Sequence, residues 1–324
     1  MSHIIDKIEK AKLMGRGGAG FPACYKWRAV KNASGFKKYI ICNASEGEPD
    51  VFKDKYILEK YPEEVINGIE IALNEIGNSS AYIYLSPKYH LQFKNKLEKL
   101  IGHLPIEIFR KTENYIAGEE TTLLNVIEGK REEPRMKPPF PTESGLYGCP
   151  TLVNNVETFY HISKVSKDEY KGTRFYSISG DVKHKGVFEL SEIWSVKKIL
   201  RETNNWPDFD FFVKTGGGAT GSILLKDELD GLVEGAGAII VFDKKKTKLI
   251  PLMKKWAEFF LNGNCDKCTP CREGMYRILE ALNSGKELDK QIFDDIFFVL
   301  EKTSFCPLGK EAYKTFKDLI NKIQ

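Results

Sequence analysis

Three cysteines lie within seven residues toward the C-terminal end of the chain. The segment Cys265–Cys271 has the spacing C-x2-C-x2-C, and a fourth cysteine, Cys306, follows in a Cys-Pro pair. Two intervening residues make one tight turn, so three such thiolates can occupy three corners of a cubane cluster, and a distant cysteine can close the fourth corner. The pattern therefore indicates one [4Fe–4S] cluster on Cys265, Cys268, Cys271 and Cys306.

A zinc site and three unrelated buried thiols are the competing interpretations of this segment. Structural zinc sites usually pair two C-x2-C hairpins, which would leave the middle cysteine unused. The chain has seven cysteines in all, and this odd, sparse number disfavours a disulfide scaffold. Cys24, Cys42 and Cys149 are scattered, and we interpret them as inert buried thiols.

A glycine-dense loop near the N-terminus is the second candidate for chemistry. Gly15–Gly20 matches G-x-G-x-x-G, but it follows a predicted helix and runs into Phe21-Pro22, whereas a dinucleotide fingerprint follows a strand and opens a helix. Four glycines in six residues nevertheless expose backbone N–H groups and permit close approach of a flat or phosphorylated ligand. Arg16 and Lys26 add positive charge. A purely structural turn is the alternative, and it would need fewer glycines.

Three polar segments are weaker candidates. Asn43–Pro49 follows a predicted strand, where ligands of open α/β sheets bind. Tyr115–Glu120 is a second acidic cluster, and Asn154–Thr158 can cap a helix or hold a phosphate on its free amides. Each of these segments alone is equally well explained as a solvated loop or a helix cap, so none of them identifies a function.

The elements that must position these residues fall into three groups. Strands predicted over 39–42, 81–85 and 106–109 alternate with helices over 62–76 and 90–100, which favours an α/β layer with a parallel sheet. Short strands over 175–179, 186–190, 211–215 and 238–242 indicate a small mixed β unit. Helices over 252–262, 272–283, 290–302 and 309–323 indicate a bundle that carries the cysteines. Between the first two groups, 131–150 is proline-rich, and 151–165 is predicted to be helical from Asn155.

Composition excludes several classes of protein. The 324 residues suit about two or three domains, and a net charge of +4 is too small to argue for nucleic acid. The N-terminal residues lack the apolar stretch of a signal peptide, and no apolar run approaches the roughly 20 residues of a membrane-spanning helix. We expect a cytoplasmic protein with no direct membrane insertion, which reaches a membrane only through partners.

Taken in order, the motifs resemble those of one family, the NADH-binding flavoprotein subunit of respiratory complex I. The family also includes diaphorase subunits of NAD-linked hydrogenases and formate dehydrogenases. The resemblance covers nearly the whole chain and rests on Gly15–Pro22, Lys26-Trp27, Cys42–Pro49, Tyr115–Thr121, Glu128-Gly129, Pro134-Arg135, Lys137–Pro141, Gly145–Gly148, Pro150-Thr151, Asn154–Thr158 and Cys265–Gly274.

The resemblance implies FMN, one [4Fe–4S] cluster and a bound NAD(H). By motif position, the FMN contacts would be Gly15, Arg16, Gly17, Lys26, Asn43, Ser45, Glu46, Gly47, Tyr115, Gly118, Glu119, Asn154, Asn155 and Thr158. The NAD contacts would be Phe21, Glu48, Glu120, Lys137 and Phe140. Aromatic faces suit adenine stacking, and carboxylates can accept hydrogen bonds from ribose hydroxyls. No side chain need act as an acid or base, because hydride chemistry belongs to the cofactors.

The resemblance also implies a three-part fold and an activity. We expect a Rossmann-like α/β nucleotide domain over 1–171, a ubiquitin-like β domain over 172–245 and a helical bundle with the cluster over 246–324. The implied activity is NADH dehydrogenation through FMN, with single electrons passed to the cluster and on to a partner. That partner would be a [2Fe–2S] thioredoxin-like subunit, a larger iron–sulfur subunit or a hydrogenase subunit.

Two alternatives to this activity stay open. One is a flavin subunit of a hydrogenase, formate dehydrogenase or bifurcating complex that works toward NAD+ reduction or with another hydride donor. The other is a non-catalytic iron–sulfur relay that has lost the flavin.

Overall fold

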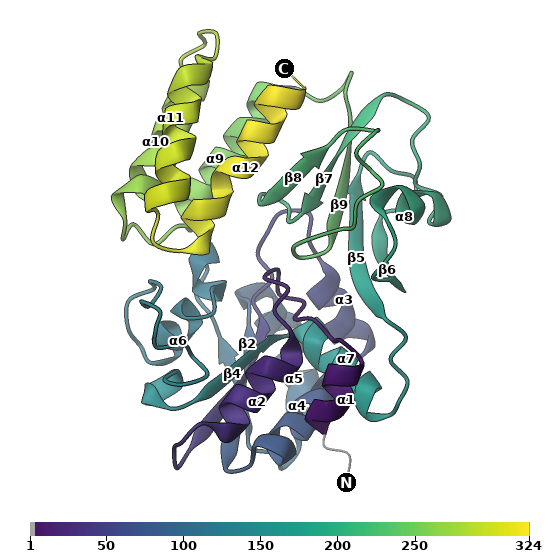
Figure 1. Cartoon of the computed structure of the whole chain (residues 1–324), viewed down its shortest axis with the longest axis vertical. Helices are drawn as coiled ribbons and strands as arrows, with labels where there is room; N and C mark the ends of the chain where they lie inside the picture. Colours follow the sequence, from purple (N-terminus) through teal and green to yellow (C-terminus); the bar gives the residue numbers. More distant parts are fainter. Residues whose placement is uncertain (1–3, 324) are drawn as a thin grey trace.

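The computed structural model of the chain, which describes residues 4–323, has three parts that are separate in Figure 1. The first is an α/β unit at the bottom of that view. Its sheet is parallel, with the order β3-β2-β1-β4. The strands are β1 (Lys38–Ala44), β2 (Ser79–Leu85), β3 (Ile106–Arg110) and β4 (Thr151–Asn155).

Both faces of this sheet are covered, and strand β1 shows why. Its residues alternate between two apolar cores, with Ile40 and Cys42 in one and Tyr39 and Ile41 in the other, as the two-residue period of a strand requires. The first core is formed with α1 (Ile4–Lys10), α2 (Ala23–Asn32), α3 (Lys53–Lys60), α4 (Pro62–Ile76), α5 (Pro87–Ile101) and α7 (Val156–Ser166). The second is formed with α6 (Thr122–Ile127) and the 3-10 turns η1 (Tyr115–Gly118) and η2 (Leu146–Gly148).

The second part is a mixed five-stranded sheet with the order β6-β5-β9-β7-β8. Its first strand, β5, and its last, β9, are parallel neighbours, and the outer hairpins are antiparallel. Helix α8 (Val196–Glu202) shares the core of this sheet. The strands are β5 (Thr173–Gly180), β6 (Gly186–Ser191), β7 (Phe211–Gly216), β8 (Gly221–Leu224) and β9 (Ala238–Asp243). The strand order agrees with the ubiquitin-like β unit that we expected.

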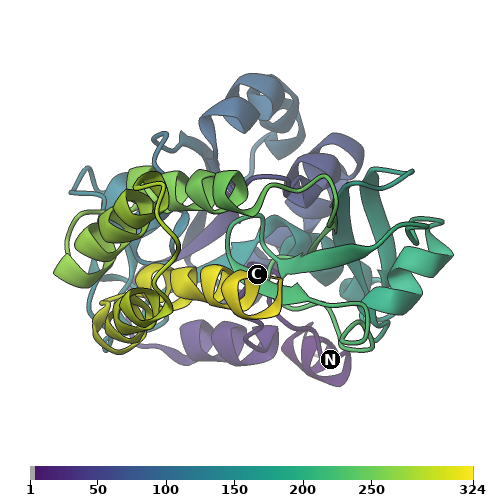
Figure 2. The ribbon, with the colours of Figure 1, turned by 90° about the horizontal axis from the view of Figure 1, so that it is seen from above.

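The third part is a helical bundle, which lies beside the β8 edge of the second sheet in Figures 1 and 2. Its helices are α9 (Leu249–Gly263), α10 (Thr269–Asn283), α11 (Lys290–Thr303) and α12 (Pro307–Lys322), and they enclose one apolar core. Helix α12 is fixed to β8 through Asp318, which accepts a hydrogen bond from the Ile223 N–H at 2.9 Å.

The expected α/β fold is confirmed, with differences in individual elements. The helix predicted over 62–76 matches α4, and the helix predicted before the glycine loop is α1, which ends at Lys10. Residues Thr151–Asn155, which we expected to be the segment directly before a helix, form strand β4 instead. Helices α2, α3, α6 and α8 and strand β8 were not predicted. Among residues 4–323, no helix combines the length and the apolar character that crossing a membrane would need.

Candidate functional site

The carboxyl ends of β1 and β4 form the natural ligand position of the parallel sheet. Strands β2 and β3, which follow β1 in the chain, lie on one side of β1 in the sheet, and β4 lies on its other side. In open α/β sheets, ligands bind outside the carboxyl ends of strands at such a switch point. Asn43 and Asn155 are register partners at these ends, and Asn154 lies opposite Cys42. Two of the predicted polar segments therefore meet here.

The two ends of the glycine loop pair with each other, and the loop lies next to the carboxyl end of β4. Met14 and Pro22 form a β-bridge, and the Gly15 N–H donates to the Phe21 carbonyl at 2.8 Å. Gly18 has φ +108° and Gly20 has φ +59°, and a Cβ on either would meet nothing within 4 Å. A Cβ on Gly17 would lie 3.5 Å from the Asn155 Cβ, so the loop rests against the start of α7. Exposed loop amides next to a helix N-terminus fit a phosphate-bearing cofactor such as FMN.

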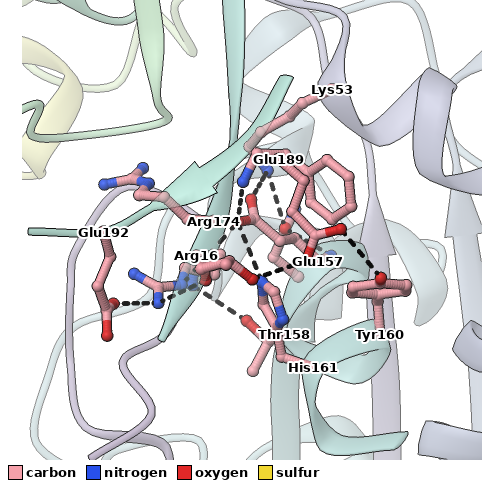
Figure 3. A network of polar contacts seen from close by, with 12 residues as sticks. Arg16, Lys53, Glu157, Thr158, Tyr160, His161, Arg174, Glu189 and Glu192 are labelled. Atoms are coloured by element: carbon pink, nitrogen blue, oxygen red, sulfur yellow. Dashed lines mark hydrogen bonds and ion pairs between the residues drawn. The ribbon is translucent and has the colours of Figure 1, made fainter. Parts of the chain in front are cut away.

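Arg16 departs from its expected role, because its side chain points into the protein. The guanidinium is 5% exposed, pairs with Glu192 and donates to the Tyr170 hydroxyl at 3.1 Å. Figure 3 shows it between the loop and β5. The Arg16 backbone N–H donates to the Thr158 hydroxyl at 3.0 Å. Arg16 and Thr158 thus fasten the loop to α7. The Arg16 charge is neutralised within the protein by Glu192.

A buried ionic network lies under the loop. The Glu157 carboxylate is fully buried, lies 3.1 Å from Lys53 Nζ and accepts the Phe175 N–H at 2.9 Å. Burial alone would raise the pKa of Glu157, but Lys53, His161 and Arg174 hold this pKa far below its usual range. Because Glu157 lies on α7 and Phe175 on β5, the network joins the α/β unit to the second sheet.

Asn43 and Asn155 are oriented by hydrogen bonds at the strand ends. The Asn43 side-chain amide donates to the Gly118 carbonyl at 2.9 Å, and its oxygen accepts the Ser45 hydroxyl at 2.5 Å. Asn155 caps α7 by accepting the Glu157 N–H at 3.0 Å. The Asn155 amide also donates to the Asn43 carbonyl at 3.3 Å, so the segments 43–45, 115–118 and 154–158 lie together in the structure.

Glu46 and Glu119 act as helix caps in the structure. Glu46 accepts the Asp54 N–H at 3.0 Å and the Tyr89 hydroxyl at 2.6 Å, at the start of α3. Burial and the nearby Asp54 raise the pKa of Glu46 to about 7. Glu119 accepts the Thr122 N–H at 2.8 Å, at the start of α6. Neither carboxylate is free of protein partners.

Glu120 lies between two lysines that were also predicted as site residues. Lys26 contacts Glu120, and Lys137 Nζ lies 3.2 Å from its other oxygen. Although burial opposes it, these two ammonium groups hold the pKa of Glu120 below its usual value. Phe21 and Phe140 are about half exposed, as stacking surfaces for a ligand must be.

Glu48 has partners that the sequence did not indicate. It accepts the Tyr115 hydroxyl at 3.0 Å and the N–H groups of Ala219 and Thr220, each at 3.0 Å. The last two residues lie in the turn between β7 and β8, so a residue expected to contact nucleotide is held by the second sheet. A run of three glycines, Gly216–Gly218, was the sequence signal for this turn.

The four predicted cluster cysteines lie at one end of the bundle, and all four are free thiols. Burial, followed by the neighbouring Cys268, Cys306 and Cys265, raises the pKa of Cys271 to about 12. Burial raises the pKa of Cys306 to about 11, although the N–H groups of Gly309 and Leu308 at the start of α12 favour its thiolate. A Cβ on Gly309, at the start of α12, would lie 3.2 Å from the Cys271 Cβ, so the segment after Cys306 packs against the segment that carries Cys271.

This site fits an anionic iron–sulfur cluster. Helices α10 and α12 begin directly after Cys268 and Cys306, so two positive helix ends point toward the thiolates. The buried Ser304 hydroxyl has no hydrogen-bond partner, and a Cβ on Gly309 would touch both it and the Cys271 Cβ. Within residues 4–323, no three His, Cys, Asp or Glu side chains are grouped so as to hold a single metal ion.

The fold and the site define a class: an α/β protein with an open glycine loop at the switch point of its sheet and a helical bundle that carries four cysteines at one end. Comparison with protein families identifies both parts. Residues 8–164 match the family described as the Nuo51 FMN-binding domain. Residues 251–324 match the NADH-ubiquinone oxidoreductase-F iron–sulfur binding region.

Individual relatives agree with this assignment. The NADH-quinone oxidoreductase F-subunit 2 of Rhizobium meliloti is 33% identical over 95% of this chain and 84% of its own length. The NADH-quinone oxidoreductase F-subunit of Aquifex aeolicus is 33% identical over 98% of this chain and 84% of its own length. The alpha subunit of the NAD-reducing hydrogenase HoxS of Cupriavidus necator is 31% identical over 98% of this chain and 59% of its own length.

A solved structure of an NAD+-reducing [NiFe]-hydrogenase in the H2-reduced state superimposes with a TM-score of 0.91 at 28% identity. It covers 98% of this chain, which spans only 61% of the solved chain. The chain therefore belongs to the family of NADH-quinone oxidoreductase F-subunits and the related hydrogenase subunits. It is an oxidoreductase of the NADH dehydrogenase type, with FMN and a [4Fe–4S] cluster as its cofactors.

Proposed function

We propose that this chain takes hydride from NADH at the switch point of its sheet and releases single electrons at its cysteine site to an iron–sulfur partner. The observation that carries the proposal is the presence of both sites in one chain: an open glycine loop against α7, and four free cysteines at the helix ends on one side of the bundle. When bound, FMN accepts a hydride and gives up electrons singly, and the cluster carries single electrons.

In this proposal, the side chains and backbone amides of the protein bind and orient FMN, NADH and the cluster. The loop amides of 17–20 and those amides at the start of α7 that Asn155 does not cap would hold the FMN phosphate, next to Asn43, Asn154 and Asn155. Arg16 would fasten the loop rather than contact the flavin, because its guanidinium is paired with Glu192 and its backbone N–H donates to the Thr158 hydroxyl. Phe21 and Phe140 would stack on the dinucleotide, and Glu120 with Lys137 would contact its polar groups. Cys265, Cys268, Cys271 and Cys306 would hold the cluster.

The partner must accept electrons one at a time, because an iron–sulfur cluster carries single electrons. The relatives are named as subunits, so this chain belongs with multi-subunit assemblies. We infer a [2Fe–2S] thioredoxin-like subunit, a larger iron–sulfur subunit or a hydrogenase subunit as the acceptor. The seven free cysteines suit a reducing compartment, so we place the activity in the cytoplasm, with any membrane association made through partners.

A second candidate function reverses the direction of flow toward NAD+ reduction. It is favoured by the close superposition on the NAD+-reducing hydrogenase. Both directions require that the bound flavin exchange electrons with NAD(H). The test is to purify the chain anaerobically, measure FMN and iron per chain, and mix it with NADH. Bleaching of the flavin absorbance supports either direction, whereas a bound flavin that does not respond to NADH contradicts both.

A further inference from the structure

The turn between β7 and β8 holds the Glu48 carboxylate with three hydrogen-bond donors. The N–H groups of Ala219 and Thr220 both donate to Oε2 at 3.0 Å. The Thr220 hydroxyl lies 2.9 Å from Oε1 and 3.0 Å from Oε2, so its single proton is shared between the two oxygens. Two successive backbone N–H groups that converge on one anion form a fixed cradle for a negative charge.

Glycine is required in this turn because the turn approaches the loop after β1 very closely. A Cβ on Gly217 would overlap the Glu48 carboxylate, and a Cβ on Gly218 would overlap the Pro49 carbonyl. Neither glycine has the left-handed backbone that disfavours other residues. Close packing against Glu48 and Pro49, rather than backbone conformation, therefore explains why glycine occupies both positions.

The bundle braces this turn from behind. Lys214 is fully buried and donates to the Thr220 carbonyl and, at 3.1 Å, to the Thr315 hydroxyl of α12. On the other side of Glu48, the Tyr115 ring packs on Phe259 of α9, with 4.7 Å between ring centroids. Burial beside Glu48 raises the pKa of Tyr115 well above its usual value, so its phenol stays protonated and donates. The Glu48 carboxylate thus contacts the second sheet directly and is connected to the bundle through Thr220 and Lys214 on one side and through Tyr115 on the other.

We propose that the β7–β8 turn is a positioning element of the nucleotide site and that it acts by fixing Glu48. The proposal rests on the proposed function, in which NADH binds beside the loop after β1. An ionised carboxylate has about four acceptor positions. The two amides take both positions on Oε2 and Tyr115 takes one on Oε1, so the second position on Oε1 is the one that a ligand hydroxyl would share with the Thr220 hydroxyl. Prior orientation of this acceptor lowers the entropy cost of binding.

The test compares two glycines of the second sheet. Gly217→Ala places a methyl group where Oε2 now lies, so it should expel Glu48 from the turn without altering the α/β unit. Gly231→Ala is the matched control, because a Cβ there would meet only the Glu228 carbonyl, at 3.9 Å. We expect Gly217→Ala to raise the KM for NADH about tenfold, the loss of one well-placed charged hydrogen bond, with kcat and FMN content unchanged. Gly231→Ala should leave all three unchanged.

A second pair of variants covers the case in which Gly217→Ala does not fold. Thr220→Val removes the hydroxyl and should raise the KM, whereas Thr220→Ser keeps it and should restore the KM of the unaltered chain. Unchanged KM in a folded Gly217→Ala, or equal KM in the two Thr220 variants, would overturn the proposal and leave the turn a purely structural contact. If the unaltered chain is itself not reduced by NADH, the proposed function fails instead.

Discussion

Replacing Glu157 by glutamine should strongly destabilise the protein, because the neutral amide leaves buried cations without their counter-ion. The carboxylate is fully buried, with Lys53 Nζ at 3.1 Å and Arg16 Nε at 3.9 Å. If the amide oxygen keeps the hydrogen bond from the Phe175 N–H, the amide nitrogen must face the Lys53 ammonium. Two donors would then point at each other in a fully buried site.

The expected loss of stability depends on which other carboxylates Lys53 and Arg16 still pair with in the variant. Breaking a buried ion pair by removing one partner costs about 3–5 kcal/mol. Lys53 keeps Asp54 at 2.7 Å and Arg16 keeps Glu192, so the lower end, about 3 kcal/mol, is expected. At about 3 °C per kcal/mol for a unit of this size, the Tm should fall by about 9 °C.

The assay is thermal unfolding followed by circular dichroism, with Glu98→Gln as the control. Glu98 is half exposed and pairs with Lys94 at 3.6 Å on a helix surface, so its loss should cost about 0.5 kcal/mol or less. The native pKa of Glu157 lies below its value in the unfolded chain. Its stabilisation is therefore present above about pH 4 and is lost as the pH falls through the native pKa, where the two proteins should converge. A Tm for Glu157→Gln within 2 °C of the unaltered chain would refute the electrostatic argument.

Two further predictions concern Lys214 and the cluster. Burial lowers the pKa of Lys214 from 10.5 to about 7, so the native state favours the neutral amine and stability should rise by about 2 kcal/mol between pH 7 and 9. Urea titrations should show that Lys214→Met lacks this rise, and an equal rise in both proteins would contradict it. Cys268→Ala should abolish the cluster's electron paramagnetic resonance signal but leave flavin reduction by NADH intact. Loss of that reduction in a folded variant would show that the two sites are not separable.

Local patterns in the sequence predict those elements whose stabilising contacts are themselves local. Helix α4 begins with Pro62 in its first turn and ends before Gly77, which has φ 65°, and its apolar residues repeat with helical spacing. The three clustered cysteines were assigned to the cluster for the same reason. Helix α3 was missed because two of its four buried residues, Lys53 and Asp54, are charged, so only its second half shows apolar residues on the inner face. Strand β4 was missed because pairing with a strand more than 100 residues away defines it.

The candidate site shows the same limit at the level of single side chains. From the order of the motifs, through the family that they resemble, we predict that the segments at 43–45, 115–118 and 154–158 lie at one site. That order does not reveal which carboxylates and cations are already paired inside the protein. Arg16 contacts Glu192, and Glu48 contacts Thr220, so each is paired with a residue more than 170 positions away. Such pairs depend on how the second sheet packs on the α/β unit, and no local pattern encodes that packing.

The most direct test of the central claim is an anaerobic titration of the purified full chain with NADH, followed by visible absorption and electron paramagnetic resonance on the same samples. The account predicts that NADH bleaches the flavin absorbance and that a reduced cluster signal appears, because one chain holds both sites. Flavin that is bound but unaffected by NADH, in protein whose cluster is reduced by dithionite, would contradict it.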